Sequence, residues 1–336
     1  MIKDIIKKIV DKENLTIEEA YSTMLSIMNG ETTSAQIACF ITALRMKGET
    51  VEEITGCARA MREKAVRINV KKDIVVDTCG TGGDGGKTFN VSTACAIVAA
   101  GAGLTVAKHG NKAVSSLCGS ADVLTALGVN IQSDVKKTEE CINTIGIGFL
   151  FAPLFHTAMK HAIGPRQEIG IRTIFNILGP LTNPAGAHAQ VLGVFSESLT
   201  EKLAGVLSNL GVKNAFVVHS NDGLDEISIS SDTKISEVKH GKVSTYYINP
   251  EKFGINKSSL SSIQGGNPQR NAEIIHNILN GEKSPYRDIV ILNSACVIAA
   301  SGMSSNISGG IKLAEESIDS GKAKDKLEQL IKFTTT

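Results

Sequence analysis

The chain of 336 residues is poor in aromatic side chains: it has no tryptophan, and aromatic residues make up 4% of it. Its 42% of apolar residues is nevertheless ample for the core of one large domain or of two. An excess of charge is also lacking, because 35 Lys and Arg stand against 34 Asp and Glu, which leaves a net charge of +1. No basic block stands out, so a nucleic-acid partner has no electrostatic support.

Paired cysteines and long apolar runs are lacking as well. The seven cysteines are scattered, and none forms C-x-x-C, a pattern typical of reduced, intracellular thiols that mostly fill the core. No apolar run reaches the roughly 20 residues needed to cross a bilayer. The N-terminus, MIKDIIKKIVDKENL, is amphipathic and mixed in charge, with no basic flank before an apolar segment. We therefore expect a cytoplasmic protein.

The first part of the chain is predicted to be helical. Capping-box patterns stand at Thr16–Glu19, Thr33–Gln36 and Thr50–Glu53, each followed by apolar residues at helical spacing. In the second of these helices Ile37, Phe40, Ile41 and Leu44 share one face. We expect a small all-helical subdomain over residues 1–70, which a segment near residues 165–190 could complete.

From Ile74 onward strands and helices alternate. The β-branched runs IVVDTC (residues 74–79) and LTVA (104–107) predict strands that flank a helix over residues 90–101. Ser120 and Gly128 predict the N-cap and the end of another helix. Further strands are expected at residues 148–152, 189–195 and 215–220, and a hairpin over 237–248 that turns at His240-Gly241. The alternation predicts an α/β domain over residues 71–336 with a mainly parallel central sheet.

The glycine-rich loop after the first of these strands resembles two nucleotide-binding motifs but satisfies neither. Gly80, Gly82 and Gly85 fit G-x-G-x-x-G, yet Lys87-Thr88-Phe89 separate the glycines from the helix that should begin on them. The acidic residue expected about 20 positions later is also missing. A P-loop that ends at Thr88 would need glycine at position 81, where the chain has threonine.

The loop is better explained as a longer anion cradle, with a second one beside it. The glycines between residues 80 and 85 allow backbone N–H groups to turn inward, and Asn90, Ser92 and Thr93 open the following helix. Lys108, Asn111 and Lys112 follow the next strand, and small polar residues continue from Ser115 to Ser120. Two neighbouring strand ends that each lead into a phosphate-sized cradle suit a ligand with phosphates at both ends.

Three further elements carry candidate ligands. Asp225 and Glu226 are adjacent carboxylates after a strand and a glycine turn, and beside phosphate cradles we expect them to bind Mg²⁺ and not merely to form a solvated acidic turn. Arg166 follows Gly164-Pro165 and could clamp a carboxylate, whereas a structural salt bridge is expected for Arg172. His109 lies in the second cradle, where it could accept a proton or simply contact the ligand.

Together these motifs resemble the anthranilate phosphoribosyltransferase family, and they occur in order over nearly the whole chain. The matching segments are GTGGD (80–84), KTFNVST (87–93), KHGN (108–111), GSADVLTALG (119–128), IRTIFNILGPLTNP (171–184) and DGLDEIS (222–228). One departure is Lys112, where the family often has arginine; lysine keeps the charge but not the fork.

The resemblance implies a fold of the nucleoside phosphorylase/phosphoribosyltransferase type, a homodimer formed through the helical part, and transfer of the 5-phosphoribosyl group from 5-phosphoribosyl 1-pyrophosphate to anthranilate. Mg²⁺ is the implied cofactor, and the substrates are small molecules, with neither nucleic acid nor membrane as partner. Donor binding is implied for Gly80, Gly83, Asp84, Thr88, Asn90, Val91, Ser92, Thr93, Lys108, His109, Gly110, Asn111, Lys112, Ala113, Val114, Ser115, Ser116 and Ser120.

Other roles follow from the same resemblance. Gly80, Asn111 and Arg166 would contact anthranilate, and Ser92, Asp225 and Glu226 would bind the metal. Lys108 and His109 are the implied catalytic residues. Two alternatives stay open at this point: a pyrimidine nucleoside phosphorylase-like enzyme, and a non-catalytic relative that binds nucleic acid.

Overall fold

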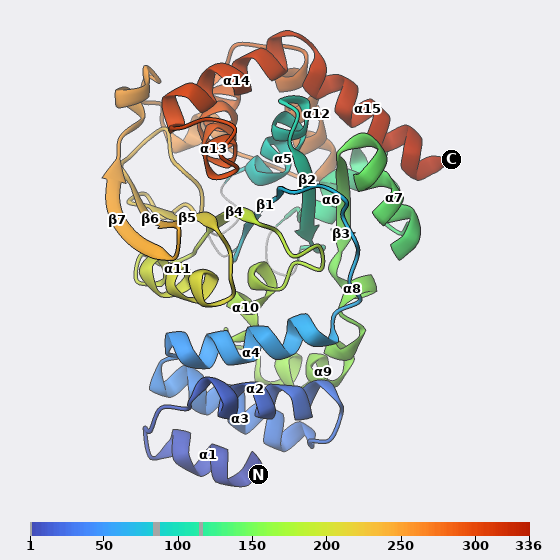
Figure 1. Cartoon of the computed structure of the whole chain (residues 1–336). Coiled ribbons are helices and arrows are strands. Elements are labelled where there is room, and N and C mark those ends of the chain that lie inside the picture. The colour runs from blue at the N-terminus through green and yellow to red at the C-terminus, as the bar shows by residue number, and fades with distance from the viewer. Residues whose placement is uncertain (1, 83–87, 114–116) are drawn as a thin grey trace.

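The computed structural model describes residues 2–82, 88–113 and 117–336. Its N-terminal part is helical, as predicted, and consists of α1 (Ile2–Val10), α2 (Ile17–Met28), α3 (Ser34–Lys47) and α4 (Val51–Lys64). A later helix, α9 (Lys160–Ile169), packs against α2 and α3. Figure 1 shows these helices as a layer below the rest of the molecule. The proposed boundary between residues 70 and 71 stays a prediction.

The predicted capping boxes are present at the start of α2, α3 and α4. In each, the threonine side chain accepts a hydrogen bond from the backbone N–H three residues later, and the side chain at that position bonds back to the threonine N–H. The predicted apolar face of α3 is buried throughout: Ile37, Phe40, Ile41 and Leu44. Local capping and apolar spacing together therefore account for these helices.

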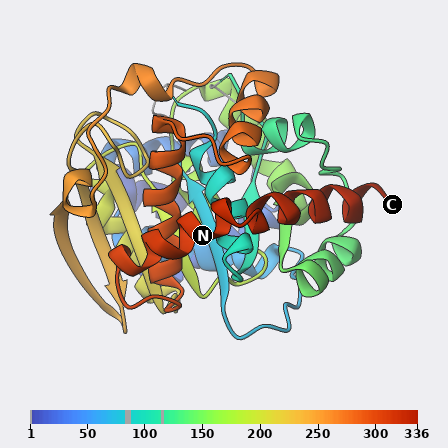
Figure 2. The same ribbon diagram turned by 90° about the horizontal axis from the view of Figure 1, so that it is seen from above.

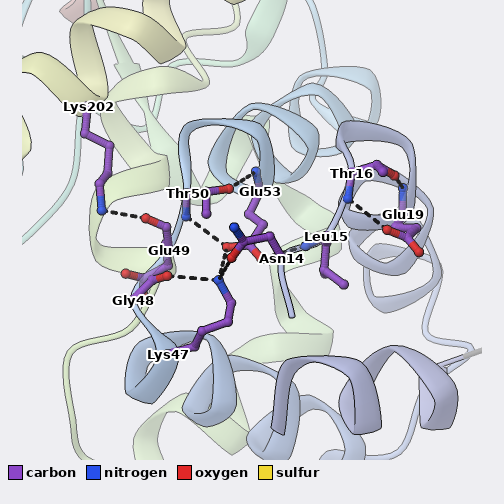
Figure 3. A network of polar contacts seen from close by, with 10 residues as sticks. All are labelled: Asn14, Leu15, Thr16, Glu19, Lys47, Gly48, Glu49, Thr50, Glu53 and Lys202. Carbon is purple, nitrogen blue, oxygen red and sulfur yellow. Dashed lines mark hydrogen bonds and ion pairs between the residues drawn. The ribbon is translucent and has the colours of Figure 1, made fainter. Parts of the chain in front are cut away.

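The capping box of α4 belongs to a larger buried network, drawn in Figure 3. The Glu53 side chain is fully buried and forms an ion pair of 2.9 Å with Lys47. Its other oxygen accepts the Leu15 N–H at 2.9 Å, so one carboxylate joins three segments of the helical part. Lys202 donates to the Glu49 carbonyl at 2.5 Å. This last bond ties the helical part to α11 (Leu199–Asn209) beside the sheet.

The described residues form a seven-stranded, mainly parallel sheet in the order β3-β2-β1-β4-β5-β6-β7. The strands are β1 (Val75–Gly80), β2 (Thr105–Gly110), β3 (Ile147–Phe151), β4 (Ala189–Gly193), β5 (Asn214–Ser220), β6 (Thr233–Lys239) and β7 (Lys242–Ile248). β1 to β5 run parallel, and β6 is antiparallel to both of its neighbours, β5 and β7. The hairpin turns at His240 (φ 49°) and Gly241 (φ 77°), as predicted. The α/β fold class is thereby confirmed.

Helices cover both faces of this sheet. The remaining helices are α5 (Val91–Gly101), α6 (Ser120–Ala126), α7 (Val135–Ile145), α8 (Ala152–Phe155), α10 (Phe175–Leu178), α12 (Pro268–Leu279), α13 (Pro285–Ala300), α14 (Ile307–Asp319) and α15 (Lys322–Thr335). α5 and α13 pack on the central strands, and α15, dark red in Figure 2, lies against α5. α11 packs on β5 and β6 and also contacts α4, which joins the helical layer to the sheet.

All seven cysteines are free, and all except Cys39 are buried, in agreement with core-filling thiols. Among the described residues no helix is both long enough and apolar enough to cross a membrane.

The strand order places a ligand-binding crevice in a definite position. β1 lies between β2 on one side and β4 on the other, and all three run parallel. After β1 the chain adds β2 and β3 on one side of that strand, and it then crosses back to add β4 on the other side. In open α/β sheets ligands bind at such a switch point, beyond the carboxyl ends of the strands.

Candidate functional site

A cavity of about 490 Å³ lies beyond the carboxyl ends of β1 and β2. Most of the predicted ligand residues that the structure describes line it: Gly80, Thr88, Asn90, Val91, Ser92, Lys108, His109, Gly110, Asn111, Lys112, Ala113, Ser120, Arg166, Asp225 and Glu226. Segments up to 146 positions apart thus meet in one place (residues 80 and 226). The structure gathers the predicted set, while the role of each member stays a prediction.

Some predicted residues stand outside this set. Thr93 is fully buried, and its Oγ1 has no hydrogen-bond partner among the described residues. It lies beside a small inner hollow next to Leu124, behind the cavity wall. Gly83, Asp84, Val114, Ser115 and Ser116 were also predicted to bind the donor, but they lie outside the described residues.

The second cradle is closed by Asp122, and this corrects one prediction. The N-cap of α6 is Gly119, not Ser120. The Asp122 carboxylate accepts the N–H groups of both Gly119 and Ala113 at 2.9 Å. A Cβ on Gly119 would come within 2.4 Å of the Ala113 nitrogen, so only glycine fits there. Ser120 is thereby left facing the cavity, and its hydroxyl donates to the Asn111 carbonyl at 3.3 Å.

The two cradles are joined through Asn90. Its side chain donates to the Cys118 carbonyl at 3.1 Å and accepts from the Asn271 amide at 2.9 Å. Asn271 on α12 is 2% exposed and also accepts the Gly266 N–H at 2.7 Å. The Asn90 amide group therefore uses one donor and its acceptor oxygen to hold neighbouring loops together. Asn271 could not be predicted from the sequence, because its contact with Asn90 spans 181 positions.

Lys108 is a buried cation at the base of the cavity. Its side-chain nitrogen donates to the Thr78 carbonyl at 2.5 Å and to the Ser92 hydroxyl at 3.2 Å. Burial lowers the pKa of Lys108, while the nearby Asp77 carboxylate opposes that shift. Lys108 therefore places a cation at the base of the cavity and donates to Ser92, a predicted metal ligand.

The carboxylate loop reaches the cavity from the end of β5. The Asp225 carboxylate accepts the Gly82 N–H at 3.0 Å, so this loop is tied to the first cradle. Among the described residues no group of three or more His, Cys, Asp and Glu side chains is placed to hold a metal. Two carboxylates and one hydroxyl fit a Mg²⁺ ion that takes its remaining ligands from substrate phosphates and water.

His109 packs against a second buried histidine, His156, with ring centroids 5.0 Å apart. Burial, reinforced by His156, lowers the pKa of His109 to about 3. Burial also lowers the pKa of His156 to about 4. The Nε2 atoms of both rings lack hydrogen-bond partners among the described residues. At neutral pH both rings are uncharged, and His109 contributes to the lining of the cavity while its Nε2 stays buried.

The buried histidines make the stability of the fold pH-dependent. Their folded pKa values, about 3 and about 4, lie below the usual 6.5, so as pH falls the unfolded chain takes up protons first. The stabilisation is complete above about pH 6.5 and decreases below it, by about 2 kcal/mol per histidine between pH 7 and pH 5. Between pH 7 and pH 5 the free energy of unfolding of His156→Gln should therefore fall by about 2 kcal/mol less than that of the parent. Urea unfolding at both pH values measures this difference. Equal losses would contradict the buried, neutral state.

Arg166 and Arg172 also line the cavity. The Arg166 guanidinium, on α9, lies 5.0 Å from the centre of the Phe175 ring, and burial lowers its pKa. Arg172, for which a structural salt bridge was expected, lines the cavity and lies 4.7 Å from the Phe195 ring. Asn176 and Phe195 also line the cavity and were missed. For Phe195 the one available signal was its position just after β4, because that strand ends beside β1.

Comparison with known proteins agrees with this arrangement. Residues 72–324 match the family described as "Glycosyl transferase family, a/b domain". Residues 3–65 match the "Glycosyl transferase family, helical bundle domain". An anthranilate phosphoribosyltransferase of Acetivibrio thermocellus is 56% identical over 100% of this chain and 97% of its own length. That of Geotalea uraniireducens is 55% identical over 99% of both chains.

Solved structures give the same picture. Anthranilate phosphoribosyltransferase from Thermus thermophilus superposes with a TM-score of 0.94 at 42% identity, over 98% of this chain and 99% of that one. The Saccharomyces cerevisiae enzyme in complex with PRPP and Mg superposes with a TM-score of 0.90 at 30% identity, over 99% of this chain and 98% of that one.

Proposed function

This chain belongs to the anthranilate phosphoribosyltransferase family, and from that premise we propose how its residues perform the reaction. The enzyme transfers the 5-phosphoribosyl group from 5-phosphoribosyl 1-pyrophosphate to the amine of anthranilate. The products are N-(5-phosphoribosyl)anthranilate and pyrophosphate, a step of L-tryptophan biosynthesis, and Mg²⁺ is the cofactor. The assignment of roles rests on one observation: the described residues of both cradles, the arginines and the carboxylate pair line a single cavity.

The donor occupies the two cradles in this proposal. The N-terminus of α5, with Ser92 in its first turn, and the loop after β2 offer backbone N–H groups, hydroxyls and the charge of Lys112. Lys108 contributes its buried charge from below. Ser92, Asp225 and Glu226 would hold Mg²⁺, which when bound neutralises charge on the pyrophosphate.

Anthranilate lies on the arginine side of the cavity in this proposal. Arg166 clamps its carboxylate, because a guanidinium donates two parallel hydrogen bonds to such a group. Gly80 and Asn111 flank the ring. His109 lines the cavity but its Nε2 is buried, and burial holds its pKa at about 3, so it suits contact with the substrate better than it suits carrying a proton.

The reaction exchanges one bond at C1 of the ribose. The bond from the anthranilate nitrogen to C1 forms, and the bond from C1 to the pyrophosphate oxygen breaks with its electron pair leaving on that oxygen. The nitrogen gives up one proton to water or to the departing pyrophosphate. The main obstacle is the charge of the leaving group, so fixed positive charge and N–H donors contribute most. A dedicated strong base is unnecessary on this account.

A direct assay tests the proposal. Adding 5-phosphoribosyl 1-pyrophosphate and Mg²⁺ to the enzyme and anthranilate should remove anthranilate fluorescence, and omitting either should not. Phosphate-dependent cleavage of a pyrimidine nucleoside would instead favour the phosphorylase alternative. A salt-dependent DNA shift without transferase activity would favour the nucleic-acid-binding one.

The oligomeric state and location are also proposals. A groove of about 570 Å³ between α1 and α3 is lined by apolar residues that include Val10 and Met46, which are 62% and 84% exposed. A second copy of the helical part would cover these side chains, as the family resemblance implies. We expect Met46→Glu to shift the protein from dimer to monomer in light scattering after gel filtration; an unchanged dimer mass would place the interface elsewhere. A cytoplasmic location stays a prediction.

A further inference from the structure

The loop that carries Asp225 and Glu226 crosses directly over the ends of two strands. Gly80 of β1 and Gly193 of β4 are paired in the sheet. A Cβ on Gly193 would lie 1.6 Å from the Asp225 carbonyl oxygen, and one on Gly80 would lie 2.6 Å from an Asp225 carboxylate oxygen. Neither glycine has a positive φ. Glycine is therefore required here for space and not for backbone conformation.

The same loop is also held by hydrogen bonds from α13. Asn293 is 2% exposed, and its amide oxygen accepts the Ile227 N–H at 2.9 Å. Its amide nitrogen donates to the Ile227 carbonyl at 2.8 Å. Both backbone groups of the residue that follows Glu226 are thus satisfied by one buried side chain, and a buried backbone group that loses its partner is costly.

We propose that Gly193 and Asn293 are positioning residues for the carboxylate pair: Gly193 by leaving room for the Asp225 backbone, and Asn293 by fixing the backbone beyond Glu226. This inference rests on the proposed role of Asp225 and Glu226 in binding Mg²⁺. Neither Gly193 nor Asn293 lines the cavity, so neither touches the substrates. Their effect reaches the reaction only through the place of the two carboxylates.

The test is the Mg²⁺ dependence of the rate at saturating concentrations of both substrates. In Gly193→Ala the added Cβ must push the Asp225 backbone away, so we expect the Mg²⁺ concentration for half-maximal rate to rise at least tenfold. The KM for anthranilate should stay within twofold of the parent value. Gly205→Ala is the matched control, because a Cβ at that helical position meets only Val51 at 3.5 Å, an ordinary contact.

Asn293→Ser serves as the second variant, because serine is small and still polar, and it should shift the Mg²⁺ requirement in the same direction. A folded Gly193→Ala with the parent's Mg²⁺ requirement overturns the inference. Failure of both variants to fold, judged by circular dichroism, overturns it too, since both residues would then be general requirements of the fold. If the carboxylates themselves can be replaced without changing the Mg²⁺ dependence, it is the proposed metal role that fails.

Discussion

Replacing both carboxylates of the loop after β5, as Asp225→Asn with Glu226→Gln, is expected to lower turnover about 10³-fold, which corresponds to about 4 kcal/mol of lost transition-state stabilisation. The amides keep the size of the side chains and can still accept the Gly82 N–H, so the loop should keep its position. What is lost is the negative charge that attracts Mg²⁺. The measurement is kcat over a range of Mg²⁺ concentrations.

A matched control removes two neighbouring carboxylates elsewhere. Glu197→Gln with Glu201→Gln removes the two acidic partners of Lys234. Both glutamate side chains are 51% exposed. The double change alters net charge by the same amount but lies outside the cavity, so kcat should be unchanged. Near-normal turnover of Asp225→Asn with Glu226→Gln would refute the metal assignment.

Arg166→Ala is expected to raise the KM for anthranilate about 10- to 100-fold with a smaller change in the KM for the phosphoribosyl donor. A hydrogen bond to a charged group contributes about 1.5–3 kcal/mol, and Arg166 would donate two to one carboxylate. The guanidinium is half-buried over Phe175, which keeps competing water away. Steady-state kinetics with each substrate varied in turn separates the two constants.

Arg172→Ala is the informative comparison for this prediction. Arg172 lines the same cavity but is exposed and lies over Phe195. If Arg166 alone clamps the carboxylate, its loss should weaken anthranilate binding far more than the loss of Arg172. A KM for anthranilate that stays at the parent value in Arg166→Ala would exclude it as the clamp.

Much of this architecture was predictable because the relevant signals are local. The capping box at Thr50–Glu53 needs only neighbouring residues, and the hairpin turn at His240-Gly241 only needs two residues that tolerate positive φ. Strands such as Val75–Gly80 are marked by β-branched runs bounded by glycine. The prediction of Ser120 as an N-cap was wrong, because the cap lies one residue earlier, at Gly119. There the Asp122 carboxylate also accepts the Ala113 N–H, a contact that sequence patterns do not describe.

The supports of the site were not predictable from the sequence. Asn271 looks like an ordinary polar residue on an amphipathic helix and Asn293 like one in a largely apolar helix, yet each bonds to a loop far away in the chain. Gly193 reads as a glycine within an apolar strand. Only the structure shows that a side chain at this position would collide with the Asp225 backbone. Such requirements depend on tertiary packing, which leaves no periodic pattern in the sequence.

In the proposed enzyme, the two loops beyond β1 and β2 hold opposite ends of one phosphorylated sugar. A crystal structure of the enzyme with 5-phosphoribosyl 1-pyrophosphate and Mg²⁺ tests it most directly. We expect the sugar in the cavity between Asn90 and Asn111, with the metal between the pyrophosphate and the Asp225-Glu226 loop. Electron density for the donor in another part of the molecule, or a metal bound away from that loop, would contradict it.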